Sequence, residues 1–220
     1  MDGPASREEL RACLRDLERV NRWLLGYRPT LDWLDSMNLK PHAGPIRILD
    51  VGCGYGDTLR RIERWAHRRG IDVELTGLDL NPQSTALAAE AAEGAAIEWV
   101  TGDVFDYMPR EPLDLVVSSL FTHHLADAEV VRFLSWMEAH AAMGWFVNDL
   151  SRAPIPYHLF GWFARVMRLH PFVRHDGPVS IARAFQQQDW KRMCAAAGLA
   201  DDEYRIVPWT PGRLCVSRCK

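Results

Sequence analysis

Residues 46–56 read Ile-Arg-Ile-Leu-Asp-Val-Gly-Cys-Gly-Tyr-Gly, and this stretch decides the fold. It begins with a short apolar run, continues with an acid, and ends in glycines that stand two residues apart. A short apolar run of this kind is typical of a buried strand. Glycines directly after a strand let the backbone turn tightly and let a ligand lie against bare main chain. The stretch therefore predicts a strand that leads into a ligand-binding loop.

The spacing of Gly52, Gly54 and Gly56 separates two kinds of ligand. The dinucleotide-binding fingerprint is G-x-G-x-x-G, whereas here the third glycine comes one residue early and Asp57 stands in its place. Asp57 is also placed to cap the helix that follows. A carboxylate there repels a pyrophosphate, which binds the positive end of such a helix. The spacing therefore favours a ligand without phosphate groups and disfavours a nicotinamide-dependent reductase.

From residue 46 onward, short apolar segments alternate with helical patterns, which is typical of βαβ units and a parallel sheet. We expect strands at residues 46–51, 73–79, 97–101, 113–118 and 145–149. A hairpin follows, with strands at residues 204–208 and 213–217, so the last strand is expected to run antiparallel to its neighbour. The prediction is an α/β fold, a Rossmann-like three-layer sandwich around a seven-stranded, mostly parallel sheet.

Helical patterns precede and interrupt this sheet. Residues 6–25 carry apolar side chains at three- and four-residue steps, and residues 31–39 form a shorter helix. Residues 151–187 are an insertion after the fifth strand and carry a second apolar stripe at helical spacing. We expect one domain over residues 1–220, in which residues 1–44 form a helical lid and the insertion forms a helical cap.

The composition excludes several other classes of protein. Lys and Arg number 26 against 29 Asp and Glu, and no dense basic block indicates a nucleic-acid or membrane partner. The five cysteines form no C-x-x-C pair, which argues against a disulfide framework or a zinc site, and no metal is expected. No signal peptide or membrane span is recognisable. We expect a cytoplasmic monomer or homodimer with a small-molecule substrate, no nucleic acid and no stable membrane insertion.

Residues 50–56, Asp-Val-Gly-Cys-Gly-Tyr-Gly, resemble motif I of the class I S-adenosylmethionine-dependent methyltransferases. The resemblance implies that S-adenosyl-L-methionine is the cofactor, that Asp79 holds its ribose hydroxyls, and that residues 102–104 hold its adenine. It also implies that the first helix and Trp33 fold over the cofactor. The cofactor-binding residues implied are Asp50, Gly52, Gly54, Gly56, Asp79, Leu80, Asp103, Val104 and Ser119.

The end of the fourth predicted strand bears on the acceptor of the methyl group. Nucleic-acid amino-methyltransferases of this fold carry Asn/Asp-Pro-Pro-aromatic there, whereas residues 118–124 read Ser-Ser-Leu-Phe-Thr-His-His, so nucleic-acid bases are disfavoured. Histidine, with a usual pKa near ~6.5, suits removal of a proton from a phenol, whose pKa is ~10. Asp149 ends the fifth strand at the same edge. We expect His123, His124 and Asp149 to be catalytic, with either histidine as the base.

Residues 121–124, 148–152 and 175–185 together resemble a narrower group, the methyltransferases encoded beside type III polyketide synthases in bacteria. This resemblance implies a phenolic or quinone-like polyketide as the aromatic substrate. The substrate-binding residues it implies are Phe121, Tyr157, Trp162, His175 and Arg183. His175, Asp176 and Arg183 equally fit a second role, in which they lock the insertion by ion pairing. O-methylation is the leading hypothesis, and ring C-methylation of a quinol and a non-catalytic cofactor-binding subunit are the alternatives.

Overall fold

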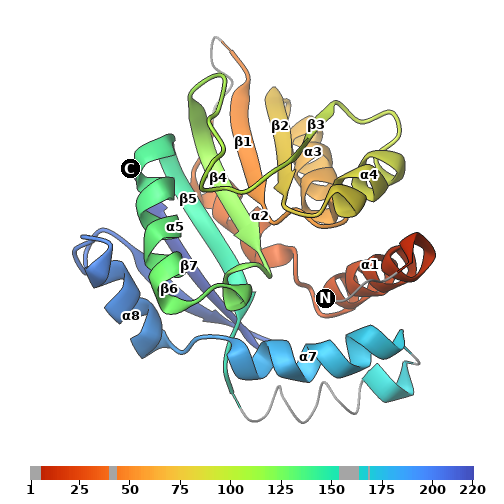
Figure 1. Ribbon diagram of the computed structural model, residues 1–220. Helices are drawn as coiled ribbons and strands as arrows, with labels where there is room; N and C mark the ends of the chain where they lie inside the picture. Colours follow the sequence, from red (N-terminus) through yellow and green to blue (C-terminus); the bar gives the residue numbers. More distant parts are fainter. Residues whose placement is uncertain (1–5, 40–43, 154–163, 168) are drawn as a thin grey trace.

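The computed structural model of the protein describes residues 6–39, 44–153, 164–167 and 169–220. Its strands form one seven-stranded sheet in the order β3-β2-β1-β4-β5-β7-β6 (Figure 1). The strands are β1 (Ile46–Val51), β2 (Val73–Asp79), β3 (Ile97–Thr101), β4 (Leu113–Ser119), β5 (Ala141–Leu150), β6 (Arg205–Trp209) and β7 (Arg213–Cys219). β7 runs antiparallel to both β5 and β6, and the other pairings are parallel. The predicted sheet and its hairpin are thereby confirmed.

Helices connect the strands and follow the predicted alternation. They are α1 (Arg7–Trp23), α2 (Arg28–Ser36), α3 (Asp57–Arg69), α4 (Pro82–Ala91), α5 (Asp127–His140), α7 (Pro171–Arg183) and α8 (Gln187–Ala196), with a 3-10 turn, η1 (Thr122–His124). α1 begins with a capping box in which Ser6 and Glu9 bond each other's backbone N–H. In the described part of the chain, no helix is long and apolar enough to cross a bilayer.

The buried core is divided into two clusters, one on each face of the sheet, because successive side chains of a strand point to opposite faces. In β4, Leu115 and Val117 pack with residues of α2 and α3, whereas Val116 packs with residues of α5 and α8. In β5, Phe146 belongs to the first of these clusters and Trp145 to the second. Because successive side chains of a strand point to opposite faces, a continuous apolar run fills both clusters. The sheet is therefore the middle layer of three.

One expectation about the helices, the cap of α3, is wrong. Asp57 does not cap α3, because Gly56 occupies the cap position in a left-handed conformation and Asp57 is the first helical residue. The Asp57 carboxylate instead accepts a hydrogen bond from the Tyr27 hydroxyl at 2.6 Å. Trp33 lies on the buried face of α2 and stacks on Phe146 with a centroid distance of 5.1 Å, so its side chain is part of the core.

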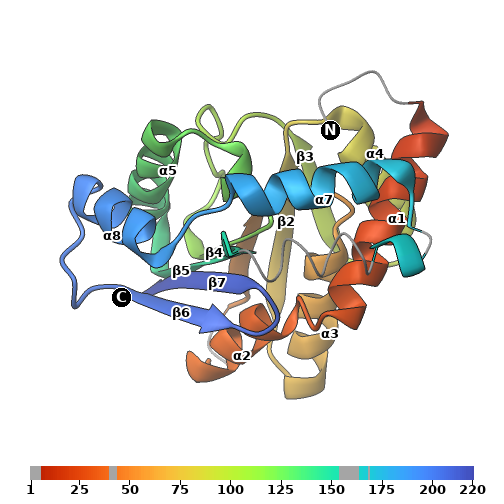
Figure 2. The same ribbon diagram turned by 90° about the horizontal axis from the view of Figure 1, so that it is seen from below.

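The carboxyl ends of the strands are covered by α7 and α1. Figure 2, seen from below, shows α7 crossing in front of the sheet and meeting α1 at its side. Cys13 and Val20 of α1 and Val173 of α7 form one buried cluster. Tyr55, in the loop after β1, packs on Leu10 of α1 in another cluster. The first helix therefore lies against the glycine loop.

A buried polar network attaches the first two helices to the sheet. The Arg213 guanidinium of β7 donates to Asn21 Oδ1 at 2.7 Å and to Asn148 Oδ1 at 3.2 Å. The Asn148 amide in turn donates to the Gly26 carbonyl at 2.8 Å and to the Thr30 hydroxyl at 3.1 Å. Both Arg213 and Asn148 are buried. One strand pair thus supplies the donors for the connection between α1 and α2.

We predict that Arg213→Met lowers the free energy of unfolding by about 1–3 kcal/mol for each acceptor that loses its donor. The half-buried Asn21 Oδ1 would lose this donor, and the buried Asn148 Oδ1 would keep only the weak donor of the Cys215 thiol at 3.8 Å. Urea unfolding measures the change. Arg205→Met is the matched control, because Arg205 is exposed on the neighbouring strand, and its expected effect is within about 0.5 kcal/mol. Equal stabilities of the two variants would refute this role of Arg213.

Candidate functional site

The loop after β1 is held against the end of β2 by main-chain hydrogen bonds. The N–H groups of Gly52 and Cys53 donate to the Leu78 carbonyl at 2.8 Å and 3.1 Å. The Gly54 N–H donates to Asp79 Oδ2 at 2.8 Å. Gly52, Gly54 and Gly56 all have positive φ, at 72°, 52° and 67°, a conformation that glycine adopts without strain.

The three glycines of the loop differ in what surrounds them. A Cβ at Gly52 would lie 2.7 Å from the Phe121 ring, and a Cβ at Gly56 would overlap the Trp99 indole. At Gly54, by contrast, a Cβ would have no atom within 4 Å. Gly52 and Gly56 are therefore needed for packing inside the protein. Gly54 is the position where the main chain is open to a ligand.

Asp79 connects three loops at the rim of the sheet. Its Oδ1 accepts from the Asn81 N–H at 2.9 Å, and its Oδ2 accepts from Gly54. Its main-chain carbonyl accepts from the Gly102 N–H at 3.0 Å. Burial raises the pKa of Asp79, and the two N–H donors oppose that rise. Each carboxylate oxygen keeps a second lone pair, which suits two further donors such as ribose hydroxyls.

The other residues expected to bind a nucleoside lie at the ends of β2, β3 and β4. Leu80 is 72% exposed, so its side chain offers an open apolar surface. Asp103 is exposed and its Oδ1 accepts from the Phe105 N–H at 2.9 Å, while Val104 is buried. Ser119 is half-buried at the end of β4. The structure thus brings the loops after β1, β2 and β3 to one edge, as predicted.

Asp50, at the end of β1, is a buried carboxyl without a partner in the part of the chain that the structure describes. It is 1% exposed, and neither of its oxygens has a hydrogen-bond partner among the described residues. Burial, followed by the nearby carboxylates of Asp57 and Asp79, raises the pKa of Asp50 well above its usual range. An unpartnered buried acid of this kind suits a cationic donor. With open main chain at Gly54 and free lone pairs on Asp79, the residues fit a positively charged nucleoside such as S-adenosylmethionine.

A second group of residues lies at the ends of β4 and β5. Leu120 follows β4 in a left-handed conformation, with φ of 57°, and its N–H donates to the Asn148 carbonyl at 3.1 Å. This turn leads directly into η1 and places Thr122 and His123 against Asp149 of the neighbouring strand. The turn is what brings a histidine and an aspartate together across the rim.

The Asp149 carboxylate accepts four hydrogen bonds. Its Oδ1 lies 2.7 Å from His123 Nδ1 and accepts from the Leu150 N–H at 2.7 Å, and its Oδ2 accepts from the His123 N–H at 3.0 Å and from the Thr122 hydroxyl at 2.5 Å. Burial raises the pKa of Asp149, but His123 and these hydrogen bonds outweigh burial and hold that pKa well below its usual range. An ionised carboxylate only accepts, so His123 Nδ1 carries the proton.

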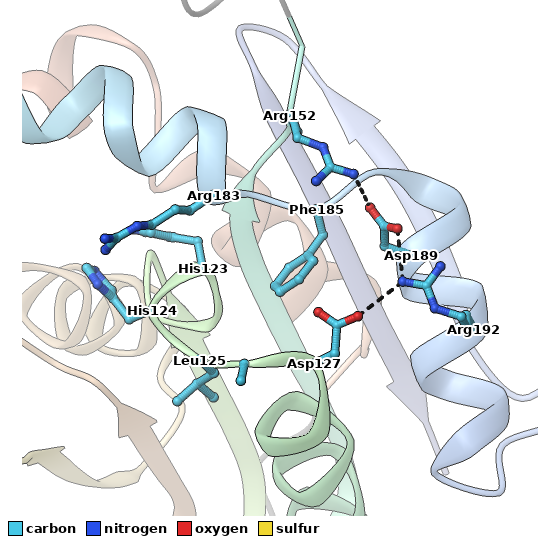
Figure 3. A pocket seen from close by; sticks show the side chains of 10 residues that line it. His123, His124, Leu125, Asp127, Arg152, Arg183, Phe185, Asp189 and Arg192 are labelled. Carbon is cyan, nitrogen blue, oxygen red and sulfur yellow. Dashed lines mark hydrogen bonds and ion pairs between the residues drawn. The ribbon is translucent and has the colours of Figure 1, made fainter.

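A cavity of about 360 Å³ lies beside this pair. Figure 3 shows Arg183 at one side of it with the two histidines of η1, and a chain of ion pairs at the other side. Among the described residues no group of three or more His, Cys, Asp and Glu is placed to hold a metal ion. The described lining residues are mostly polar: His123, His124, Leu125, Ala126, Asp127, Arg152, Arg183, Phe185, Asp189 and Arg192.

The predicted substrate residues are spread more widely. Arg183 lines the cavity. The structure does not bring His175 there, since its side chain is 80% exposed and pairs with Asp176 at 3.0 Å. Phe121 packs over Gly52 and edge-on to Phe133. Two further predicted residues, Tyr157 and Trp162, lie outside the described residues.

Sequence reasoning missed two kinds of residue at the site. Trp99 fills the space beside Gly56, and Thr122 bonds Asp149. The charged residues Asp189 and Arg192 of α8 also line the cavity. No spacing in the sequence predicts that α8 lies near η1. Nor does the sequence predict which glycine a tryptophan in a strand will contact. Only Thr122 carried a signal, because it is a polar residue directly before the two histidines.

The order of the strands and the three convergent loops define the Rossmann-like methyltransferase fold. The plantazolicin methyltransferase BpumL, solved in complex with SAH, has this fold. It matches with a TM-score of 0.68 over 96% of this chain and 95% of that chain, at 12% sequence identity.

Comparison of sequences gives the family. Residues 48–144 match a family described as a methyltransferase domain. Trans-aconitate 2-methyltransferase of Streptomyces avermitilis is 34% identical over 203 residues, which cover 84% of this chain and 73% of that protein. Trans-aconitate 2-methyltransferase of Mycobacterium tuberculosis is 30% identical over 104 residues, 47% of this chain and 36% of that protein. The chain belongs to the S-adenosylmethionine-dependent methyltransferases and is an enzyme that uses this cofactor.

We predict that Gly54→Ala weakens binding of S-adenosylhomocysteine by about tenfold or more. The new methyl meets no protein atom, so the stability cost is only the left-handed strain of about 1–2 kcal/mol. Gly70→Ala is the matched control, because Gly70 has φ of 65° and equally open surroundings at the end of α3. Calorimetric titration should show normal affinity in the control. Normal affinity in Gly54→Ala would contradict an open ligand position there.

We predict that Asp50→Asn stabilises the free protein at about pH 8 and weakens S-adenosylhomocysteine binding. The unfolded acid ionises near pH ~3.9 and the folded acid only at higher pH, so between these values the folded state holds more protons and wild-type stability falls as pH rises. Asparagine removes that loss. Thermal unfolding from about pH 4 to pH 8 should therefore show the variant gaining on the wild type with rising pH. A gap that is constant with pH would contradict a raised pKa of Asp50.

Proposed function

We propose that the enzyme transfers the methyl group of S-adenosylmethionine to a hydroxyl of a small aromatic acceptor, with His123 as the base and Asp149 as its partner. The observation that carries this proposal is the 2.7 Å contact between His123 Nδ1 and Asp149 Oδ1 beside the cavity. Asp149 holds the proton on Nδ1, which leaves Nε2 as the acceptor of a proton. His123 is preferred to His124 because only its ring bonds Asp149 in this way.

The residues of this chain divide the work of such a transfer. When bound, the cofactor supplies an electrophilic methyl on a sulfonium. His123 Nε2 takes the hydroxyl proton as the acceptor oxygen forms its new bond to carbon, and Asp149 stabilises the resulting imidazolium. The proton therefore stays within the buried pair. Proximity and alignment at the rim supply the rest of the rate.

The aromatic class of the acceptor is supported by two observations. Phe185 lines the cavity and provides a flat apolar contact. Residues 121–124, 148–152 and 175–185 resemble the methyltransferases encoded beside type III polyketide synthases, which favours a phenolic or quinone-like polyketide. Ring C-methylation of a quinol uses the same base, because removing a hydroxyl proton activates the ring carbon.

A second candidate acceptor is a carboxylate oxygen. It is favoured by the relatives named trans-aconitate 2-methyltransferase and by the arginines of the cavity. A carboxylate is already ionised at neutral pH and needs no base. A bonded, buried His123–Asp149 pair therefore supports a hydroxyl acceptor over this one.

We predict that His123→Ala lowers kcat by about 10²–10⁴-fold, the usual contribution of a general base, and leaves S-adenosylhomocysteine affinity unchanged. The assay follows transfer from methyl-labelled cofactor to a series of phenols, resorcinols and hydroquinones. Mass mapping of the product separates O- from C-methylation. His140→Ala is the control, since His140 lies at the end of α5 and bonds the Trp136 carbonyl. Full activity of His123→Ala would reject the base and leave the carboxylate acceptor.

A further inference from the structure

Among the described residues, three guanidinium groups line the cavity beside the His123–Asp149 pair, which we call the dyad. Two of these guanidinium groups form ion pairs with carboxylates. Arg152 Nη2 lies 2.8 Å from Asp189 Oδ2, and Arg192 Nη2 lies 3.1 Å from Asp189 Oδ1 and 3.2 Å from Asp127 Oδ2. The Gln186 N–H also donates to Asp189 Oδ2 at 2.9 Å. That N–H, with the two arginines, lowers the pKa of Asp189. Asp127 and Asp189, the two carboxylates among the described lining residues, are thus already paired with arginines.

Arg183 is the third guanidinium, and it differs from the other two. It forms no ion pair or hydrogen bond with any residue that the structure describes. It is the last residue of α7, where the helix carbonyls stabilise a cation. That stabilisation leaves its N–H donors available. Among the described lining residues, the three arginines therefore carry one positive charge more than the two carboxylates neutralise.

The position of Arg183 relative to the dyad indicates what this positive charge could bind. In Figure 3 the Arg183 side chain extends toward His123 and His124, on the side of the cavity away from the Arg152–Asp189–Arg192 chain. A guanidinium presents paired N–H groups that match the two oxygens of a carboxylate. A small acceptor held there by a carboxylate would place its neighbouring groups at His123.

We propose that Arg183 determines acceptor specificity by binding a carboxylate of the substrate, so that the enzyme methylates hydroxy-aromatic acids rather than neutral phenols. This inference rests on the proposed function, because it takes the methylated group to be a hydroxyl presented to His123. The carboxylate only binds and leaves the reaction unchanged. The hydroxyl oxygen forms the bond to the methyl carbon, the carbon–sulfur bond breaks, and the hydroxyl proton goes to His123.

The test uses two probes of the same shape that differ in charge, salicylate and salicylamide. Each is titrated by calorimetry into protein saturated with S-adenosylhomocysteine, so that no turnover is needed. The wild type should bind salicylate about tenfold more tightly or better, as expected for a charge-assisted pair. Arg183→Gln should lose that preference by weakening salicylate alone, and Arg183→Lys should keep part of it. Arg174→Gln is the matched control, an exposed arginine on the same helix that does not line the cavity.

The outcomes separate this inference from the proposed function. Failure of the wild type to prefer salicylate, including failure to bind it, or a preference that survives in Arg183→Gln, would overturn the carboxylate site. His123→Ala should keep the preference, because binding precedes proton removal. If His123→Ala also keeps full methyl transfer, the role of the His123–Asp149 pair as the base is refuted, whereas the carboxylate site at Arg183 is still supported.

Discussion

One carboxylate, that of Asp79, holds together the loops that follow β1 and β2 at the carboxyl edge of the sheet. Asp79 receives main-chain N–H groups on both of its oxygens, from Gly54 in the preceding loop and from Asn81 in its own, and its carbonyl receives Gly102 from the third. A parallel sheet places the ends of its strands side by side but does not fix the loops that follow. The geometry of the loops and the expected recognition of a ribose thus depend on the same two oxygens of Asp79, so a substitution there would change both.

Much of this arrangement was readable from the sequence, for physical reasons. A short run rich in apolar and β-branched residues predicts a strand, and β1, β2 and β3 begin and end where such runs were found. Asp79 could be placed because it ends such a run. His123 follows one predicted parallel strand and Asp149 ends the next. Both could be placed at one edge because the carboxyl ends of parallel strands lie at the same edge of a sheet. The structure adds that β4 and β5 are direct neighbours, which makes the pair a bonded one.

What the sequence withheld depends on contacts between distant elements. The preference for His123 over His124 as the proposed base follows from the left-handed turn at Leu120. Leucine rarely adopts this conformation, so the sequence does not predict the turn. The start of β5 was expected at residue 145, but the strand runs directly on from α5 and begins at Ala141. The pairing that engages Arg192 requires α8 to lie along α5, and no local pattern records that packing.

The hydrogen bond between Arg213 and Asn21 joins residues 192 positions apart. A ribosome therefore synthesises α1 and α2 first, yet their buried acceptors meet their donor only after β7 has emerged. Closing so large a loop is slow compared with forming local helices. The polar network that attaches α1 and α2 to the sheet is therefore completed only after β7 has joined it.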